Sequence, residues 1–241
     1  MTNSNIDPEE IAKFERMAEE WWKEEGNFRL LHQFNPIRIS YIKDMVSLHH
    51  NKPNPEKPLQ DISILDVGCG GGLLAEPMCR LGAKVTGIDA STKNIKVAAL
   101  HAEKMGLEIN YQHTRLEEIS HQKFDVVLAM EVVEHVPDLE DFISHCASAT
   151  KKGGLIFIAT LNRTLKSFIC AILGAEYLLR WLPRGTHSWQ KFVKPSEIAR
   201  SFDLTGIKIQ DMTGMKLNPL SKQWRLSRDL DVNYVIVGMK H

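Results

Sequence analysis

A glycine-rich turn that directly follows an apolar segment is the strongest constraint on how this chain can fold. Residues 64–74 read Ile-Leu-Asp-Val-Gly-Cys-Gly-Gly-Gly-Leu-Leu, so an apolar run that contains Asp66 breaks into four glycines within five positions. Glycine is needed where a backbone turns sharply or approaches a ligand that a Cβ atom would block. We therefore expect a buried strand, a tight ligand-binding turn and then a helix.

The spacing of these glycines argues against a dinucleotide site. The nucleotide-binding pattern G-x-G-x-x-G would need a third glycine where the chain has Leu73. The chain instead has the pattern D-x-G-x-G-x-G, which begins at Asp66. A carboxylate repels a pyrophosphate, but it accepts hydrogen bonds from an ammonium group. The pattern therefore indicates a cofactor with a cationic amino-acid end.

Charge and cysteine usage exclude several classes of protein. The 241 residues include 30 basic and 30 acidic ones, so the chain lacks the basic field of most nucleic-acid-binding proteins, and we expect no nucleic-acid partner. The four cysteines lie far apart without a C-x-x-C motif, which argues against a zinc site or a disulfide framework. The acidic residues Asp7, Glu9 and Glu10 argue against a signal or transit peptide, and no run of about 18 apolar residues occurs in the sequence. We expect a soluble cytoplasmic protein.

The N-terminal part of the chain has a helical pattern. Asp7 followed by Pro8 is typical of a helix start, and a second helix is expected from Arg38 to Leu48. A proline-rich connector at residues 51–58 then interrupts the pattern. We therefore expect an N-terminal helical cap at residues 1–60 and a main domain at residues 61–241, within a single structural domain.

Apolar segments alternate with amphipathic helices from residue 62 onward. The expected strands are Ile62–Val67, Lys84–Asp89, Ile109–His113, Phe124–Met130 and Leu155–Leu161. Such alternation predicts a parallel sheet that is covered by helices on both faces. Near the end, Ile207–Met212 and Val232–Met239 have no helical pattern between them, so we expect an antiparallel pair at the sheet edge.

Polar residues at the ends of the expected strands mark the candidate site, because ligands of open parallel sheets bind outside the carboxyl ends of the strands. The second strand ends in Asp89, where a carboxylate commonly binds ribose hydroxyls. The alternative is a charge that only stabilises a helix N-terminus. The fourth strand runs through Met130 into Glu131, and Lys152-Gly153-Gly154 forms a turn before the fifth strand.

These features together resemble the class I S-adenosylmethionine-dependent methyltransferases. The segments that carry the resemblance are Asp66–Gly72, Asp89, Phe124–Val136 and Lys152–Gly154. The resemblance implies a Rossmann-like α/β fold with a seven-stranded, mostly parallel sheet, an antiparallel last strand and S-adenosylmethionine as cofactor. It also implies that Asp66, Gly68 and Gly70 lie at the methionine part of the cofactor, Asp89 at the ribose, and Met130 against the adenine or the methionine.

Segments outside this core resemble the ubiquinone-biosynthesis O-methyltransferase family over almost the whole chain. They are Trp21-Trp22, Leu31-His32, Asn35–Arg38, Met130–Pro137, Leu161–Arg163, Gly174–Tyr177, Gly185–His187 and Asp231–Tyr234. The resemblance implies methylation of a catechol hydroxyl on a polyprenylated ring, at two steps of ubiquinone biosynthesis, with other enzymes of that pathway as further partners. It also implies that Arg38 binds the cofactor, where the sequence alone allows a solvated residue. A small-molecule methyltransferase with another hydroxyl or carbon acceptor is the alternative.

Glu131, Glu134 and His135 form a candidate metal set. Their spacing brings Glu131 near the other two residues if the segment is helical. A divalent cation at these residues would lower the pKa of a bound catechol. The mixed ligands suit manganese, zinc or cobalt better than magnesium. Without a metal, the three side chains only shape the pocket, and Glu131, His135 or His187 becomes the candidate general base. His187 is equally compatible with a plain surface histidine.

An insertion after the fifth expected strand, at residues 163–195, contains an unusually apolar helical segment. Apolar residues cover most of its helix surface, and basic residues flank it. The segment is too short and too charged to span a bilayer. It suits an amphipathic helix at a membrane surface, or a lid over the substrate. We expect residues 165–187 to contact an anionic membrane surface and the protein to associate peripherally with the inner face of the membrane.

Overall fold

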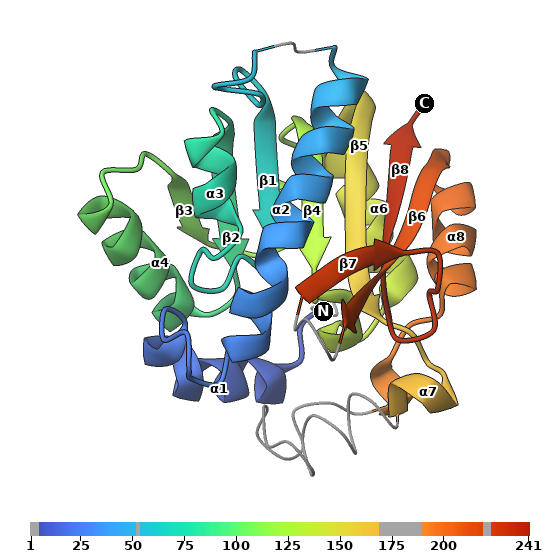
Figure 1. Ribbon diagram of the computed structural model, residues 1–241, viewed down its shortest axis with the longest axis horizontal. Coiled ribbons are helices and arrows are strands. Elements are labelled where there is room, and N and C mark those ends of the chain that lie inside the picture. The colour runs from blue at the N-terminus through green and yellow to red at the C-terminus, as the bar shows by residue number, and fades with distance from the viewer. Residues whose placement is uncertain (1–4, 52–53, 169–188, 219–222) are drawn as a thin grey trace.

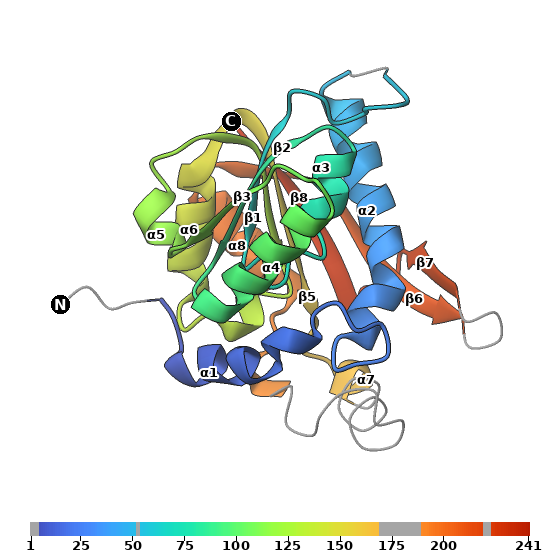
Figure 2. The same ribbon diagram turned by 90° about the vertical axis from the view of Figure 1, so that its left-hand side faces the viewer.

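The computed structural model describes residues 5–51, 54–168, 189–218 and 223–241. Its central feature is an eight-stranded sheet in the order β3-β2-β1-β4-β5-β8-β6-β7, with helices on both faces (Figures 1 and 2). The strands are β1 (Ser63–Val67), β2 (Lys84–Asp89), β3 (Asn110–His113), β4 (Phe124–Met130), β5 (Thr150–Leu161), β6 (Ile207–Asn218), β7 (Gln223–Ser227) and β8 (Asn233–Lys240). The arrangement confirms the predicted Rossmann-like α/β class.

The first five strands of the chain pair in parallel, as the sequence predicts. Strand β8 lies antiparallel between β5 and β6, which confirms the antiparallel last strand. Central strands of this kind are buried on both faces, and β1 and β4 accordingly read as nearly continuous apolar runs.

The sheet differs from the prediction in two places. It has eight strands rather than seven, because the short β7 pairs antiparallel with an extended β6. Strand β7 is mostly solvent-exposed, so its sequence carries no strong apolar pattern. Strand β5 begins at Thr150, before the expected start at Leu155, because the turn around Gly153 is continuous with the strand. Gly153 has a φ of 77°, which permits this irregular start.

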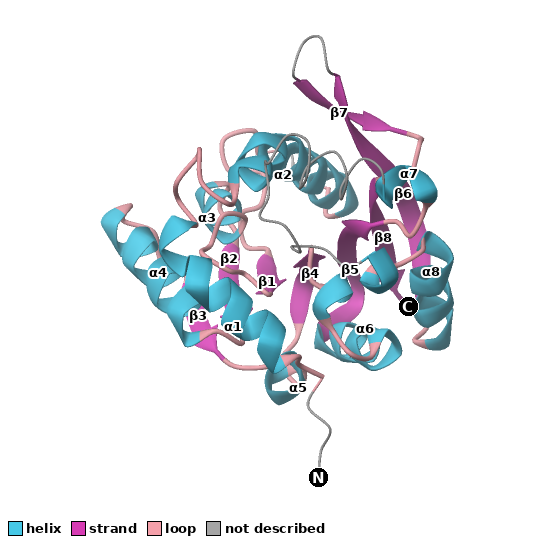
Figure 3. Cartoon of the chain, turned by 90° about the horizontal axis from the view of Figure 1, so that it is seen from below, coloured by secondary structure: helices cyan, strands magenta, loops and turns pink. Residues whose placement is uncertain are grey.

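Helices cover the two faces of the sheet. They are α1 (Pro8–Met17), α2 (Arg29–His49), α3 (Ala75–Arg80), α4 (Thr92–Lys104), α5 (Leu116–Ile119), α6 (Leu139–Ala149), α7 (Leu165–Ser167) and α8 (Pro195–Leu204), with 3-10 turns η1 (Ala18–Glu20), η2 (Val133–His135) and η4 (Trp189–Lys191). Helices α2 and α3 share one apolar core with the sheet, whereas α5, α6 and α8 share the other. Helix α1 lies across the carboxyl ends of the strands (Figures 1 and 3).

The predicted helix start at Asp7 and Pro8 is confirmed by α1. Asp7 accepts a hydrogen bond from the backbone N–H of Glu9 at 3.0 Å, and Pro8 occupies the first helical position. Ser91 is the N-cap of α4 and accepts from the N–H of Asn94. The short α3 places Pro77 in its first turn, where no intrahelical hydrogen bond is lost.

Helix α2 is longer than predicted, because it begins at Arg29 rather than Arg38 and continues through Pro36. Proline normally breaks a helix interior. Here burial holds the helix together on both sides of Pro36: Phe34 is buried before it and Ile42 after it. The Asn35 side chain also donates a hydrogen bond to the carbonyl of Leu73 at 2.7 Å, which fixes α2 against the glycine turn.

Most of the predicted insertion at residues 163–195, most of the predicted membrane-contact segment at residues 165–187, and His187 fall on residues 169–188, which lie outside the described residues. Among the helices that are described, none combines the length and the apolar character needed to cross a bilayer.

Candidate cofactor and catalytic site

A cavity of about 620 Å³ opens at the carboxyl ends of the central strands. The predicted site residues that line it are Arg38, Asp66, Gly68, Gly70, Asp89, Met130, Glu131, Glu134 and His135. Sequence reasoning therefore identified one continuous site from segments far apart in the chain. Side chains of the N-terminal helices form another part of the wall.

Asp66 and Arg38 are buried at one end of this cavity with incomplete hydrogen bonding. Burial raises the pKa of Asp66 to about 7, although the nearby Arg38 guanidinium acts to lower it. Asp66 Oδ2 and Arg38 Nε are both buried without a hydrogen-bond partner among the described residues. Buried polar groups rarely stay unpaired in a functional state. One carboxylate and one guanidinium together fit a ligand that carries both an ammonium and a carboxylate.

Asp89 is held rigidly at the end of β2. Its Oδ2 accepts a hydrogen bond from the N–H of Gly70 at 2.9 Å, and its Oδ1 accepts from the N–H of Ser91 at 2.7 Å and from Asn94 Nδ2 at 3.2 Å. Burial raises the pKa of Asp89, and these hydrogen bonds lower it. Each carboxylate oxygen can accept more than one bond, so Asp89 retains capacity for ribose hydroxyls.

Trp21 covers the glycine turn. A Cβ atom on Gly70, which has a φ of 53°, would lie 2.4 Å from the Trp21 ring, and one on Gly71 would lie 2.4 Å from Trp21 Cβ. The indole also stacks on Phe28 with a centroid distance of 3.7 Å. These glycines are therefore needed for close packing of the N-terminal segment as well as for the turn.

Trp21 is also linked to Asp89 by hydrogen bonds through the side chain of Asn94. Its Nε1 donates a hydrogen bond to Asn94 Oδ1 at 2.9 Å, and the amide of Asn94 donates to Asp89. The indole thereby fixes which end of the Asn94 amide faces the carboxylate. Sequence reasoning missed this role of Trp21 and Asn94. The only signal was the Trp21-Trp22 pair within the family resemblance.

The candidate metal set of Glu131, Glu134 and His135 is not assembled in this structure. Glu131 has a φ of 59° and lies before the 3-10 turn, so the helical spacing assumed from the sequence does not apply. The Glu131 side chain faces Arg38 at 3.4 Å, whereas Glu134 accepts a hydrogen bond from Thr160 Oγ1 at 2.8 Å. In the described part of the chain, no group of three or more His, Cys, Asp or Glu residues could hold a metal ion.

Glu134 instead has the character of a buried neutral acid. Burial raises its pKa well above the usual value, and the negative charge of Glu131 raises it further. Two carboxyl groups in contact at low dielectric do not readily both ionise. The structure therefore favours a proton on Glu134 in the observed arrangement.

His135 is held by helix α1 rather than by the other members of the set. Its Nδ1 lies 3.0 Å from Glu10 Oε2, and its ring packs edge-on against Phe14 with a centroid distance of 5.2 Å. Contact with His135 is the main cause that lowers the pKa of Glu10 to about 2. Lys191 Nζ lies 3.0 Å from the other Glu10 oxygen. Glu10 therefore stays ionised beside the imidazole, while Glu10 Oε2 and His135 Nδ1 both lack a hydrogen-bond partner among the described residues.

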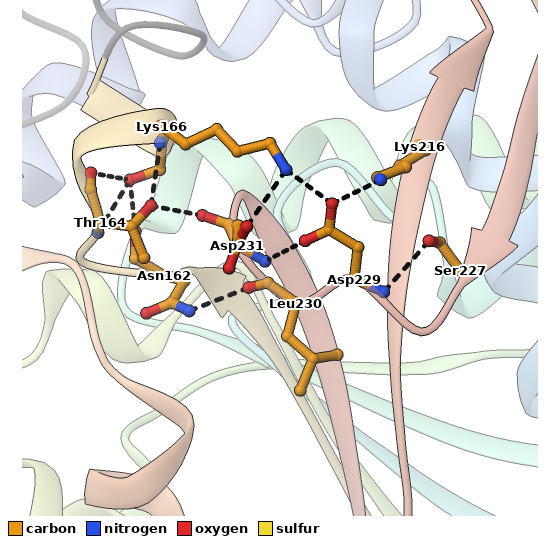
Figure 4. Close-up of polar contacts among 9 residues, drawn as sticks. Asn162, Thr164, Lys166, Lys216, Ser227, Asp229, Leu230 and Asp231 are labelled. Carbon is orange, nitrogen blue, oxygen red and sulfur yellow. Dashed lines mark hydrogen bonds and ion pairs between the residues drawn. The ribbon is translucent and has the colours of Figure 1, made fainter.

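A charged network contributes Lys166, Lys216 and Asp229 to the cavity wall (Figure 4). Lys166 of α7 pairs with Asp229 at 2.6 Å and with Asp231 at 3.2 Å, and Lys216 of β6 also pairs with Asp229. The two lysines lower the pKa of Asp229. The network joins the start of the insertion to β6 and to the segment before β8, and it neutralises the lysines that line the cavity.

Comparisons with known proteins agree with this architecture. Residues 65–158 match a family model described as a methyltransferase domain. A crystal structure of magnesium protoporphyrin IX methyltransferase from Synechocystis PCC 6803 with bound SAH has a TM-score of 0.64 at 19% identity, covering 95% of this chain and 94% of that one. A SAM-dependent methyltransferase from Aquifex aeolicus has a TM-score of 0.58 at 14% identity, covering 98% and 100%. The fold and the site define an S-adenosylmethionine-dependent methyltransferase.

The close relatives are more specific. The ubiquinone biosynthesis O-methyltransferase of Chelativorans sp. (strain BNC1) is 51% identical over 240 residues, which cover 98% of this chain and 95% of that protein. The protein of the same name from Pelagibacter ubique (strain HTCC1062) is 50% identical over 239 residues, covering 99% and 100%. The chain belongs to the ubiquinone biosynthesis O-methyltransferase family.

The link from Trp21 to Asp89 predicts a measurable effect on cofactor binding. Trp21→Phe keeps an aromatic ring on Phe28 but removes the N–H that orients Asn94. We expect the dissociation constant for S-adenosylhomocysteine, measured by calorimetry, to rise about 3- to 10-fold, the effect of one neutral hydrogen bond. The matched control is Trp189→Phe, whose indole donates to the Thr164 carbonyl. An unchanged dissociation constant in Trp21→Phe would contradict the role assigned to it.

Proposed function

We propose that this enzyme transfers a methyl group from S-adenosylmethionine to a catechol-type hydroxyl of polyprenylated ubiquinone precursors, at both O-methylation steps of ubiquinone biosynthesis. One observation carries the proposal. The cavity continues beyond the cofactor end and His135 into an apolar region built from α2 and the β6–β7 hairpin, and that region suits a ring with a hydrocarbon tail. The names of the relatives supply the acceptor class.

The protein's contribution to this reaction is alignment and proton removal. The bound cofactor supplies the electrophilic methyl group. Asp66 and Arg38 bind the amino-acid end of the cofactor, Asp89 binds its ribose, and Met130 packs against it. These contacts fix the position of the methyl group for an in-line attack by the acceptor oxygen.

His135 is the general base in this proposal. Glu10 lies at the Nδ1 edge of the ring, which leaves Nε2 to take the proton of the acceptor hydroxyl. Glu131 is the second candidate, but its carboxylate faces Arg38. His187 stays a candidate from the sequence. We derive no step through a metal ion, and the metal set of Glu131, Glu134 and His135 stays a prediction that the chelator experiment below tests.

The sequence also predicts where in the cell the enzyme acts. We infer peripheral association with the inner face of the membrane through residues 165–187, because a polyprenyl tail has to leave the bilayer near the active site. Contact with other enzymes of the pathway is part of the same prediction. The division into a helical cap at residues 1–60 and a methyltransferase domain at residues 61–241 also stays a prediction, supported by the packing of Trp21 on Gly70.

The direct test is methyl transfer to a short-tailed polyprenyl catechol, with and without a chelator. We expect turnover of the catechol and little turnover of an alkyl alcohol of matched tail length. Turnover that is insensitive to the chelator would argue against a metal ion at Glu131, Glu134 and His135. Complete inhibition that is reversed by manganese, zinc, cobalt or magnesium would support a metal ion at these residues. Absence of catechol methylation would favour another hydroxyl or carbon acceptor.

The role of His135 predicts a separation of catalysis from binding. We expect His135→Asn to lower kcat by about 10²-fold or more, the usual contribution of a general base. The affinity for S-adenosylhomocysteine should change little, because His135 is not one of the groups assigned to the cofactor. His145→Asn is the control, since His145 lies on α6 in a partly exposed pair with Asp141. A kcat that equals the wild-type value would rule out His135 as the base.

A further inference from the structure

The indole of Trp224 carries an unused hydrogen-bond donor in the cavity wall. Trp224 lies on β7 opposite Leu217 of β6, and it lines the cavity. Its Nε1 is buried without a hydrogen-bond partner among the described residues. An indole N–H that is buried normally finds an acceptor. Neither the cofactor contacts nor the base described above makes use of this donor.

Trp224 belongs to the acceptor end of the cavity rather than to the cofactor end. Its ring lies 5.3 Å from that of Phe34, and Phe34 in turn lies under the Arg38 guanidinium at 4.4 Å. Trp224 is therefore separated from the cofactor-binding Arg38 by one aromatic layer. Figure 3 shows β7 and α1 on opposite sides of the strand ends. His135 and Trp224 both line the cavity, so an aromatic ring bound there can contact both the base and the indole.

The surroundings of this donor select a neutral oxygen as its partner. Met215 and Leu217 provide apolar wall beside it. The cations at this end, Lys216 and Lys166, are both paired with Asp229, so they present little net positive charge to a ligand. An anionic group would be poorly stabilised here, whereas a hydroxyl or ether oxygen on an otherwise apolar ring would satisfy the indole N–H.

We propose that Trp224 Nε1 donates a hydrogen bond to a ring oxygen of the acceptor other than the oxygen being methylated. This inference rests on the proposed function, and it deepens that function by naming a residue that determines acceptor specificity. The β6–β7 hairpin then determines acceptor specificity, because Trp224 lies on β7 and lines the cavity. Acceptors that lack a second ring oxygen leave the indole N–H unpaired and bind more weakly.

Equilibrium binding tests the inference without requiring turnover. The ligands are a short-tailed polyprenyl catechol and the monophenol with the same tail, titrated into protein saturated with S-adenosylhomocysteine. We expect wild type to prefer the catechol, and Trp224→Phe to weaken catechol binding about 3- to 10-fold while leaving monophenol binding unchanged within about twofold. Trp189→Phe is the control for loss of an indole N–H elsewhere, and it should bind both ligands as wild type does.

Equal losses for the catechol and the monophenol in Trp224→Phe would overturn the proposal, since they would reveal a packing role alone. Unchanged catechol binding would overturn it as well, and so would failure of the wild type to bind either phenol. The turnover assay on wild type reports separately on the proposed function. A catechol that wild type methylates, but that Trp224→Phe binds equally well, would leave the methyltransferase function intact and remove Trp224 from it.

Discussion

The burial of Asp66 beside Arg38 is the constraint on which the rest of the site depends. Both groups lie where water is largely excluded, and each retains a polar atom without a partner among the described residues. Leaving such groups unpaired costs about 1–3 kcal/mol each, and the ammonium and carboxylate of a zwitterionic ligand would satisfy both. Helix α2 has to pass through Pro36 to deliver Arg38, and β1 has to end at the glycine turn to deliver Asp66.

The N-terminal helices complete the active site as well as covering it. Trp21 packs on the glycine turn and orients Asn94 toward Asp89, while Glu10 lies beside His135. In the proposed mechanism, cofactor binding and proton removal therefore depend on a segment that precedes the methyltransferase core in sequence. Another part of the cavity wall holds Trp224 of the β6–β7 hairpin and the charged network around Asp229, which joins α7, β6 and the segment before β8 (Figure 4). We propose that the ends of the central strands bind the methyl donor and that the peripheral elements position the base and the acceptor.

The sequence was sufficient for those parts of the molecule that depend on local patterns. The glycine turn, Asp89 and the parallel strands follow from spacing and periodicity, and the predicted site residues within the described part of the chain meet in one cavity. Contacts between distant segments could not be read in this way, so Glu10, Asn94 and Trp224 were missed. Local geometry also differs from two expectations. The positive φ of Glu131 means that the helical spacing assumed for Glu131, Glu134 and His135 does not apply, and the metal site stays a prediction. Helix α2 continues through Pro36 and begins before its predicted start.

The most direct test of this account is the pH dependence of S-adenosylhomocysteine affinity. Burial raises the pKa of Asp66 to about 7, and the ammonium of the ligand requires the ionised carboxylate. As pH falls below 7, protonation of Asp66 removes that partner, so affinity should fall by about tenfold or more between about pH 7.5 and about pH 5.5. Asp66→Asn should bind weakly at both values and lose this pH dependence. Wild-type affinity that is constant over the range, or an Asp66→Asn variant that binds like wild type, would contradict the central claim.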